Sequence, residues 1–463
     1  MSRDLPLLSP ADWSEAVPAI SPARTSTGRS VYIETYGCQM NVADSELVAS
    51  ILGDAGFHIT QQADQADILL LNTCAVREHA EERVIGRAAQ LSSLRNQRPN
   101  LTLGILGCMA QRLAETLPER APFVDLVMGP DAYRRLPDIL AASSSEALLD
   151  VRLNRTENYI GVDPVRRDGT NAWITIIRGC DKFCTFCIVP FVRGRERSID
   201  SVEIVRQVEQ IAAQGFKEIT LLGQTVNSYD DGKIDFAALL HAVSAVDGIE
   251  RVRFTSPYPK DFDEAAIRAI SELPQVCPNL HLPVQSGSNA QLERMRRGYT
   301  VEEYRSLVDR LRTDVAGLAL TTDIVVGFCG ETDRDFELTV ALMEEMRFDS
   351  AFMFKYSERE GTYAHKRMED DVPEEVKGER LQRIIEMQEQ ISLEVNQSLI
   401  GQTVHVLAEG PAKRPGKDGP RYYGRTDTGK NVIFRSEVPA NSLVDVCIDR
   451  TTAHTLYGNR IKK

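Results

Sequence analysis

Residues 174–187 read ITIIRGCDKFCTFC, a short apolar run that leads directly into a loop carrying Cys180, Cys184 and Cys187. The CxxxCxxC spacing allows three thiolates to wrap one compact cluster. A [4Fe-4S] cube held by three cysteines keeps one iron open to a substrate, whereas an electron-transfer cluster normally takes four. Structural zinc is the alternative, but it needs four protein ligands, and no fourth candidate lies nearby in the sequence. The stretch therefore predicts an iron–sulfur loop at the end of a strand.

The region around this loop alternates apolar runs with helical patterns. Six strands are predicted, at residues 174–177, 219–222, 252–255, 280–283, 320–326 and 351–354. Helices are predicted between most of them, at 202–214, 236–246, 264–273, 301–312 and 336–346, and a long helix from 374 to about 398 follows. Six β/α units are short of the eight of a complete barrel, so we expect a partial (β/α)6 barrel with the cysteine loop on its catalytic face.

The N-terminal part shows a second α/β series. Short apolar runs at 31–36, 68–72, 101–106 and 124–128 are separated by helical patterns at 44–55, 78–94 and 110–117, which predicts an open parallel sheet with covering helices. Cys38, Cys74 and Cys108 each follow one of these strands, and the carboxyl ends of such strands form the ligand crevice. Singly, each cysteine would be a small buried hydrophobe. Together they predict a second three-cysteine cluster site, whereas Cys277, Cys329 and Cys447 are expected to be structural.

The last segment has a different character. From residue 402 apolar and polar residues alternate between Gly and Pro turns, and further strands are predicted at 432–434 and 443–448, which indicates a small all-β barrel. Residues 401–463 contain 11 Lys or Arg and 6 Asp or Glu, a net charge of +5, which leaves −18 for residues 1–400. A basic barrel on an acidic body suggests nucleic-acid contact, with a solvated β surface as the alternative. The candidate side chains for this contact are Lys413, Arg414, Lys417, Arg421 and Arg425, with Tyr422 and Tyr423 as candidates for stacking on a base.

Composition bounds the remaining possibilities. The overall net charge of −13 and pI near 5.2 argue at face value against a polyanionic partner, until the charge is resolved by segment. No apolar run approaches the roughly 20 residues of a membrane helix, and the Pro- and Ser-rich start has no signal-peptide pattern. We therefore expect a cytoplasmic protein with a disordered leader at 1–28, an N-terminal domain at 29–145, a central domain at 166–397 and a barrel at 400–463.

The ordered motifs resemble a known family. GCDKFCTFCIVPFVRG is similar to the signature of radical S-adenosylmethionine (SAM) enzymes, and together with TYGCQMN, NTCAVRE, GCMAQ, LLGQTVNSY and HLPVQSGS it resembles the methylthiotransferases. The similarity is greatest to the branch that acts on N6-(dimethylallyl)adenosine in tRNA. The last 63 residues resemble the RNA-binding TRAM domain.

The resemblance implies a reaction and a set of cofactors. Cys180, Cys184 and Cys187 would hold a [4Fe-4S] cluster that binds SAM and generates a 5′-deoxyadenosyl radical. Cys38, Cys74 and Cys108 would hold an auxiliary [4Fe-4S] cluster that carries the sulfur. A second SAM would methylate this sulfur before its transfer to carbon 2 of the adenine, so that two SAM are used per turnover. The implied partners are a tRNA carrying N6-(dimethylallyl)adenosine next to the anticodon, an electron donor such as flavodoxin or ferredoxin, and a sulfur source. No membrane partner is implied, and a monomer is expected.

Several supporting residues are predicted. Phe186 lies where the family packs an apolar side chain against the cofactor adenine, with plain core as the alternative. Gln224, Gln285 and Glu331 follow the second, fourth and fifth strands of the central domain, where they could contact the cofactor or simply cap helices. Arg193, Arg195 and Arg197 alternate, so an extended segment would place them on one face toward tRNA phosphates, unless that face is merely solvated.

Two departures from the family pattern and two rival functions stay open. Ile199 stands where the family usually has arginine, and Cys329 where it has proline. One rival keeps the chemistry but acts on threonylcarbamoyl adenosine in tRNA or on an aspartate of a ribosomal protein. GCQMN and LLGQTVNSY favour the dimethylallyl substrate. The other rival is a non-enzymatic RNA-binding protein with a structural metal, against which six cysteines in two sets argue.

Overall fold

The computed structural model describes residues 28–75, 78–142, 148–166, 169–413 and 419–461, so nearly all of the expected leader lies outside the described residues. The chain divides into two compact units. Unit 1 contains Met1–Asp168, Arg178–Asp181 and Ile188–Ile199, and unit 2 contains Gly169–Ile177, Lys182–Cys187 and Asp200–Lys463. The cysteine loop at 180–187 is thus shared between the units along the chain.

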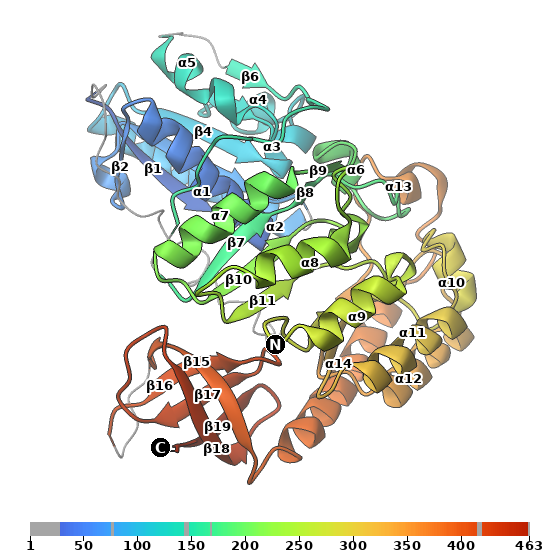
Figure 1. The fold of residues 1–463 in the computed structure, drawn as a ribbon. Helices are drawn as coiled ribbons and strands as arrows, with labels where there is room; N and C mark the ends of the chain where they lie inside the picture. The colour runs from blue at the N-terminus through green and yellow to red at the C-terminus, as the bar shows by residue number, and fades with distance from the viewer. Residues whose placement is uncertain (1–27, 76–77, 143–147, 167–168, 414–418, 462–463) are drawn as a thin grey trace. The chain divides into compact units, whose positions relative to one another are not determined.

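Unit 1 is built on a six-stranded parallel sheet with the order β2-β1-β3-β4-β5-β6 (Figure 1). Its strands are β1 (Ser30–Thr35), β2 (His58–Ile59), β3 (Ile68–Thr73), β4 (Thr102–Gly107), β5 (Leu126–Met128) and β6 (Leu148–Asp150). Its helices are α1 (Gln39–Asp54), α2 (Glu78–Ser92), α3 (Cys108–Arg112), α4 (Leu117–Arg120), α5 (Leu136–Ala141) and α6 (Val189–Val192). This arrangement confirms the open parallel sheet predicted from the sequence, with β2 and β6 as additional short strands.

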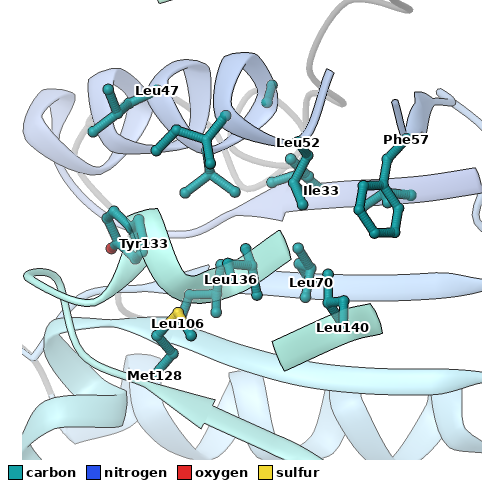
Figure 2. Packing of buried hydrophobic residues seen from close by; sticks show 14 of the residues in the cluster. Ile33, Leu47, Leu52, Phe57, Leu70, Leu106, Met128, Tyr133, Leu136 and Leu140 are labelled. Atoms are coloured by element: carbon teal, nitrogen blue, oxygen red, sulfur yellow. The ribbon is translucent and has the colours of Figure 1, made fainter. Parts of the chain in front are cut away.

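Alternate residues of the buried strands supply two hydrophobic cores, one on each face of this sheet. On one face Ile33, Leu70 and Leu106 pack with α1 and with the Tyr133–Leu140 region (Figure 2). On the other face Leu69, Leu71 and Ile105 pack with α2, α3 and α4. Both faces are covered, so the strands read as continuous apolar runs rather than as alternating ones.

The parallel strands of unit 2 form two three-stranded sheets, in the orders β11-β10-β7 and β12-β13-β14. The strands are β7 (Asn171–Thr175), β10 (Glu218–Leu222), β11 (Arg251–Phe254), β12 (Asn279–His281), β13 (Ala319–Val326) and β14 (Ser350–Lys355). The helices are α7 (Ser201–Ala213), α8 (Phe236–Ser244), α9 (Glu264–Glu272), α10 (Asn289–Arg294), α11 (Val301–Asp314), α12 (Asp333–Met346), α13 (Tyr363–Arg367) and α14 (Glu374–Gln397). An isolated parallel bridge joins Val252 of β11 to Val276, which precedes β12 in the chain. The six predicted β/α units of a partial barrel are therefore confirmed.

Local sequence signals start several of these helices. Thr300 and Glu303 form a complete capping box at the start of α11, and Thr332 and Asp335 form another at α12. Each box satisfies two backbone N–H groups that a helix start leaves without partners. Two further strands, β8 (Ile177–Arg178) and β9 (Arg197–Ser198), flank the cysteine loop.

The C-terminal residues of unit 2 form a closed five-stranded barrel with the order β15-β16-β17-β19-β18. Its strands are β15 (Thr403–Pro411), β16 (Tyr422–Thr426), β17 (Asn431–Arg435), β18 (Leu443–Thr451) and β19 (Thr455–Arg460), which confirms the predicted small all-β barrel. Buried Arg251 and Arg253 of β11 donate hydrogen bonds to barrel carbonyls of Arg425 and Thr426 at 2.8 and 2.6 Å. The barrel is thus tied to the central strands by buried charged groups.

Candidate functional site

The three N-terminal cysteines lie at the carboxyl ends of three adjacent strands. Cys38 follows β1, Cys74 follows β3 and Cys108 follows β4, and these strands are neighbours in the parallel sheet. A thiol hydrogen bond with Cys74 and the positive charge of Arg193 lower the pKa of Cys38 to about 6. The negative charge of the Cys38 thiolate contributes to raising the pKa of Cys108. The structure therefore brings together the three cysteines that the sequence separates.

Two glycines bring the three loops close enough for this convergence. Gly37 has φ +129°, and a Cβ there would lie 2.5 Å from Cβ of Cys74. Gly107 has φ +91°, and a Cβ there would lie 2.6 Å from the carbonyl oxygen of Thr73. Real Cβ atoms do not approach other atoms so closely, so both positions require glycine. The Gly-Cys pairs in TYGCQMN and ILGCMAQ have this steric origin.

A buried amide pair braces the first two loops. Asn72 donates from Nδ2 to the backbone oxygen of Asn41 at 2.8 Å and to Oγ of Ser45 at 2.9 Å. The thiol of Cys38 in turn lies 3.3 Å from Oδ1 of Asn41. Sequence reasoning missed these positioning residues, although Asn41 and Asn72 stand inside the quoted TYGCQMN and NTCAVRE motifs. Their residue types alone are equally typical of turns.

The segment after the central cysteine loop completes the surroundings of Cys108 within unit 1. Ile188 and Val192 pack against Ala75 and Cys108. Arg193 donates from Nε to Sγ of Cys108 at 3.0 Å and from Nη2 to Asp44 at 2.8 Å. Burial raises the Cys108 pKa, and the positive charge of Arg193 opposes that rise.

Asp44 is the common anchor of two buried guanidinium groups. Its second carboxylate oxygen accepts from Nη2 of Arg178 at 2.6 Å, and its side chain is fully buried. Burial alone would raise the pKa of Asp44, but the charges of Arg193 and Arg178 outweigh it and hold the pKa below its usual value. One carboxylate therefore serves two arginines, which leaves a net positive charge beside Cys108.

The alternating arginines do not share the single face expected for them. Arg193 is buried, and Arg197 is buried in an ion pair with Asp131 at 3.0 Å. Arg195 is exposed and pairs with Asp181 at 2.6 Å. The segment turns through α6 and β9 instead of staying extended, so only Arg195 has its side chain in solvent.

The central cysteine loop is held by a second buried arginine. In unit 2, Arg297 donates from Nη1 to Sγ of Cys184 at 3.3 Å, from Nε to the hydroxyl of Tyr299 at 3.0 Å and from Nη2 to the carbonyl of Pro283 at 3.0 Å. The amide of Cys187 donates to the carbonyl of Cys184 at 3.0 Å. In unit 1 the amide of Cys180 donates to the carbonyl of Gly194 at 3.2 Å. Sequence reasoning missed Arg297 because nothing in RMRRGYT distinguishes a buried arginine from an exposed one.

The candidate cofactor residues of unit 2 occupy distinct environments. Phe186 packs against a cluster that includes Met295, Phe328 and Tyr356. Gln224 has a buried side-chain oxygen without a hydrogen-bond partner among the described residues. Gln285 is buried with φ +76°, and its backbone bridges to Ile324 of β13.

The buried carboxylate of Glu331 is held by hydrogen bonds from Gly327 and Arg380. Its Oε2 accepts from the amide of Gly327 at 2.6 Å and from Nη1 of Arg380 at 2.7 Å, and burial raises its pKa. Its other oxygen has no hydrogen-bond partner within the described part of the chain.

The two positions that depart from the family pattern are both buried. Ile199 is 5% exposed, and Cys329 is 2% exposed and packs in the cluster of Phe328 and Tyr356. Burial raises the pKa of the Cys329 thiol. Cys329 is therefore a poorly ionised core thiol.

The basic candidates of the barrel are only partly described. Arg414 and Lys417 lie outside the described residues. Lys413 is exposed, Arg421 is half-buried, and Arg425 pairs with Glu409. Tyr422 packs against Phe434 in the barrel, whereas Tyr423 is 39% exposed.

Three cysteines beside one buried guanidinium have the donor chemistry of a three-cysteine iron–sulfur site. Among the residues that the structure describes, no three His, Cys, Asp or Glu side chains gather closely enough around one point to hold a metal ion. Converging thiols, with a guanidinium that donates to one sulfur, are the donors such a cluster needs.

Two family models and curated relatives match this chain. The family model of UPF0004, an uncharacterized protein family, matches residues 30–129, and the radical SAM superfamily model matches residues 174–343. The chain is 46% identical to the tRNA-2-methylthio-N(6)-dimethylallyladenosine synthase of Thermoanaerobacter pseudethanolicus, with 95% of each chain covered. It is 45% identical to the enzyme of the same name from Porphyromonas gingivalis, with 95% of this chain and 96% of that one covered.

Solved structures with low sequence identity share the fold. The radical SAM methyltransferase TsrM from Kitasatospora setae has a TM-score of 0.54 at 15% identity, over 72% of this chain and 75% of its own. The cobalamin-dependent SAM radical enzyme OxsB has a TM-score of 0.52 at 14% identity, over 85% of this chain and 64% of its own. In the described part of the chain, no helix has the length and apolar character needed to cross a membrane.

Proposed function

The chain belongs to the family of tRNA-2-methylthio-N(6)-dimethylallyladenosine synthases, and from this premise we propose how its residues carry out that reaction. It is a radical SAM tRNA methylthiotransferase, and its family uses SAM and [4Fe-4S] clusters. The proposal is that it adds a methylthio group to carbon 2 of N6-(dimethylallyl)adenosine next to the anticodon. When bound, the two clusters and SAM supply the radical that removes hydrogen from carbon 2 and the sulfur that replaces it.

The observation that carries this proposal is the convergence of Cys38, Cys74 and Cys108 at one edge of the sheet. We assign these three thiols to the auxiliary cluster, and Cys180, Cys184 and Cys187 to the cluster that binds SAM. Each set offers three thiolates, so each cluster keeps an iron for a further ligand. We further propose that two SAM are used per turnover, one for the radical and one for the methyl group.

The remaining residues position and shield these groups. Phe186, in its apolar cluster, supplies a flat surface for the cofactor adenine, and the unpartnered oxygens of Gln224 and Glu331 are suited to accept hydrogen bonds from SAM. Gln285 supports this site through its backbone bridge to β13. We propose the domain division of the sequence, with residues 29–145 for sulfur, 166–397 for radical formation and 400–463 for RNA.

For tRNA contact we propose the basic side chains that are exposed or half-buried. Arg195 near the cysteine loop and Lys413 and Arg421 of the barrel are accessible to phosphates, and exposed Tyr423 can stack on an unpaired base. The further partners are an electron donor such as flavodoxin or ferredoxin and a source of sulfur. Action as a cytoplasmic monomer completes the proposal.

Mass spectrometry of nucleosides from a strain that lacks the gene tests the substrate. We expect the 2-methylthio nucleoside to disappear and N6-(dimethylallyl)adenosine to accumulate. Loss of the methylthio group from threonylcarbamoyl adenosine, or from an aspartate of a ribosomal protein, would instead support the rival substrates. Zinc without sulfide in the purified chain would support the RNA-binding rival.

A further inference from the structure

The guanidinium of Arg193 is buried in unit 1 and makes directed hydrogen bonds there. Both the guanidinium and its partner Asp44 are almost completely buried, at 4% and 0% exposure. Nε donates to Sγ of Cys108 at 3.0 Å and Nη2 donates to Asp44 at 2.8 Å. Nη1 is buried and has no hydrogen-bond partner among the described residues. A buried donor without an acceptor is costly, so a further acceptor for Nη1 is indicated.

The charges around this guanidinium do not cancel. Asp44 is shared between Arg193 and Arg178, so two positive charges face one carboxylate. The neighbouring Tyr133 and Tyr159 have pKa values raised by burial and stay neutral. Arg197 is neutralised separately by Asp131. A net positive charge therefore remains next to the Cys108 sulfur, where it favours thiolate and any further negative charge.

We propose that Arg193 is a positioning residue that sets the charge state of the auxiliary cluster, through its hydrogen bond to Cys108 and through Nη1, which donates to a sulfur of the cluster or of its bound ligand. This inference rests on the proposed assignment of Cys38, Cys74 and Cys108 to that cluster. Hydrogen bonds to the ligand sulfurs and local charge are among the determinants of iron–sulfur reduction potentials. Because the reduced cluster carries one more negative charge, Arg193 stabilises it relative to the oxidised one and raises the potential.

Asp44 acts on the same property with the opposite sign. Its carboxylate aligns Arg193 but also adds negative charge close to the cluster. Removal of the charge of Asp44 should therefore raise the potential, whereas removal of the charge of Arg193 should lower it. A purely structural role for the pair would give no such opposition of sign.

The test uses the full chain with Cys180, Cys184 and Cys187 replaced by alanine, so that only the auxiliary cluster contributes to the signal. The reduction potential of this parent is measured by redox titration monitored by electron paramagnetic resonance, and then again with Arg193→Gln, Arg193→Lys or Asp44→Asn added. Arg197→Gln combined with Asp131→Asn is the matched control, because the pair of changes removes a buried ion pair of the same segment without changing the net charge. The side chain of Arg197 donates to the backbone carbonyls of Asn154 and Arg193, and its described contacts include no cysteine.

We expect Arg193→Gln to change the reduction equilibrium at least tenfold toward the oxidised cluster, a shift of about 59 mV for one electron. Arg193→Lys should keep most of the potential, Asp44→Asn should shift it in the positive direction, and the Arg197→Gln, Asp131→Asn control should leave it nearly unchanged. If Arg193→Gln does not hold a cluster, the sign of the shift in Asp44→Asn decides the question: a positive shift supports the inference, and a negative shift or none refutes it.

Two outcomes would overturn the inference, and they are distinguishable. A parent chain that binds no iron and sulfide would refute the cluster assignment itself, and the inference with it. Suppose instead that the parent holds a complete cluster. A potential that responds to Arg193→Gln no more than to the Arg197→Gln, Asp131→Asn control, or that shifts in the same direction for Arg193→Gln and Asp44→Asn, would refute only the role of Arg193.

Discussion

Replacement of Gly107 by alanine should dismantle the auxiliary site while the central site survives. Gly107 has φ +91° and ψ −155°, a backbone region that is essentially restricted to glycine. Forcing another residue there costs about 1–3 kcal/mol. In addition, the new Cβ would lie 2.5 Å from Oδ1 of Asn72 and 2.6 Å from the carbonyl oxygen of Thr73. Relief of such overpacking typically costs about 1–3 kcal/mol more.

The combined cost of about 2–6 kcal/mol is a large share of the stability of a domain, which is about 5–15 kcal/mol. The strain also has a direction, because Thr73 directly precedes Cys74 and Gly107 directly precedes Cys108. Relaxation therefore moves two cysteine ligands apart. We expect Gly107→Ala to lose about half of the bound iron and sulfide, and to unfold at a lower denaturant concentration.

Gly86→Ala is the matched control for this substitution. Gly86 lies on the exposed side of α2, and a Cβ there meets nothing within 4 Å. Alanine favours a helix over glycine by about 0.5–1 kcal/mol, so this variant should be slightly more stable and keep its full iron content. A Gly107→Ala chain with the iron content and unfolding midpoint of the Gly86→Ala chain would refute the steric reasoning.

Three further predictions address the remaining parts of the molecule. The reconstituted protein should contain about eight irons from two [4Fe-4S] clusters, and Cys184→Ala should remove half of them; an unchanged iron content would count against Cys184 as a ligand. Arg253→Ala should weaken the attachment of the C-terminal barrel by about 3–5 kcal/mol, because Arg253 donates to two barrel carbonyls and pairs with buried Glu218. Limited proteolysis should release the barrel from this variant, but not from a chain with Arg268→Ala at an exposed site on α9. Burial tends to raise the pKa of Asp150, but hydrogen bonds from Arg135 and Arg152 outweigh this effect and lower the pKa to about 2. The contribution of Asp150 to stability is therefore present above about pH 4 and is lost as the pH falls toward 2. Acid unfolding monitored by circular dichroism should show this loss, and Asp150→Asn should remove it.

Much of the architecture was predictable because buried parallel strands are continuous apolar runs. In the sheet of unit 1, sequence reasoning missed β2 and β6, which have two and three residues and carry too short a signal. The short strands β8 and β9 and the barrel strands β16 and β19 were not predicted either. The cysteines of unit 1 were predictable as a set, since each follows a strand and the ends of parallel strands lie at one edge. Their glycines and the Asn41–Asn72 pair were not singled out, because their roles depend on contacts between loops.

The arginines show the limit of sequence reasoning most clearly. Alternation at Arg193, Arg195 and Arg197 suggested an exposed face, yet Arg193 finds its carboxylate at Asp44, 149 residues away in the sequence. Arg297 and Arg253 are likewise buried by partners distant in the chain. From its charge alone, an arginine is expected on the surface. Only the tertiary contacts show which arginines are buried.

The barrel illustrates the same point for the electrostatic argument. Its net charge of +5 suggested an independent RNA-binding module. In unit 2, however, Arg251 and Arg253 bond its backbone, and Lys430 of the barrel pairs with Asp349 at 2.5 Å. Deletion of residues 401–463 would uncover these groups, so single substitutions of Lys413 and Arg421 test the RNA contact more cleanly.

The division of labour between the two cysteine sets is the central claim, and the most direct test is the mass of the adenine nucleoside formed by the reconstituted protein. Wild-type protein and the Cys108→Ala variant are each given SAM, a reductant and tRNA that carries N6-(dimethylallyl)adenosine. We predict that the wild type adds one methylthio group to this nucleoside. The variant should still cleave SAM to 5′-deoxyadenosine but leave the nucleoside without sulfur. Formation of the methylthio nucleoside by Cys108→Ala at the wild-type level would contradict the account.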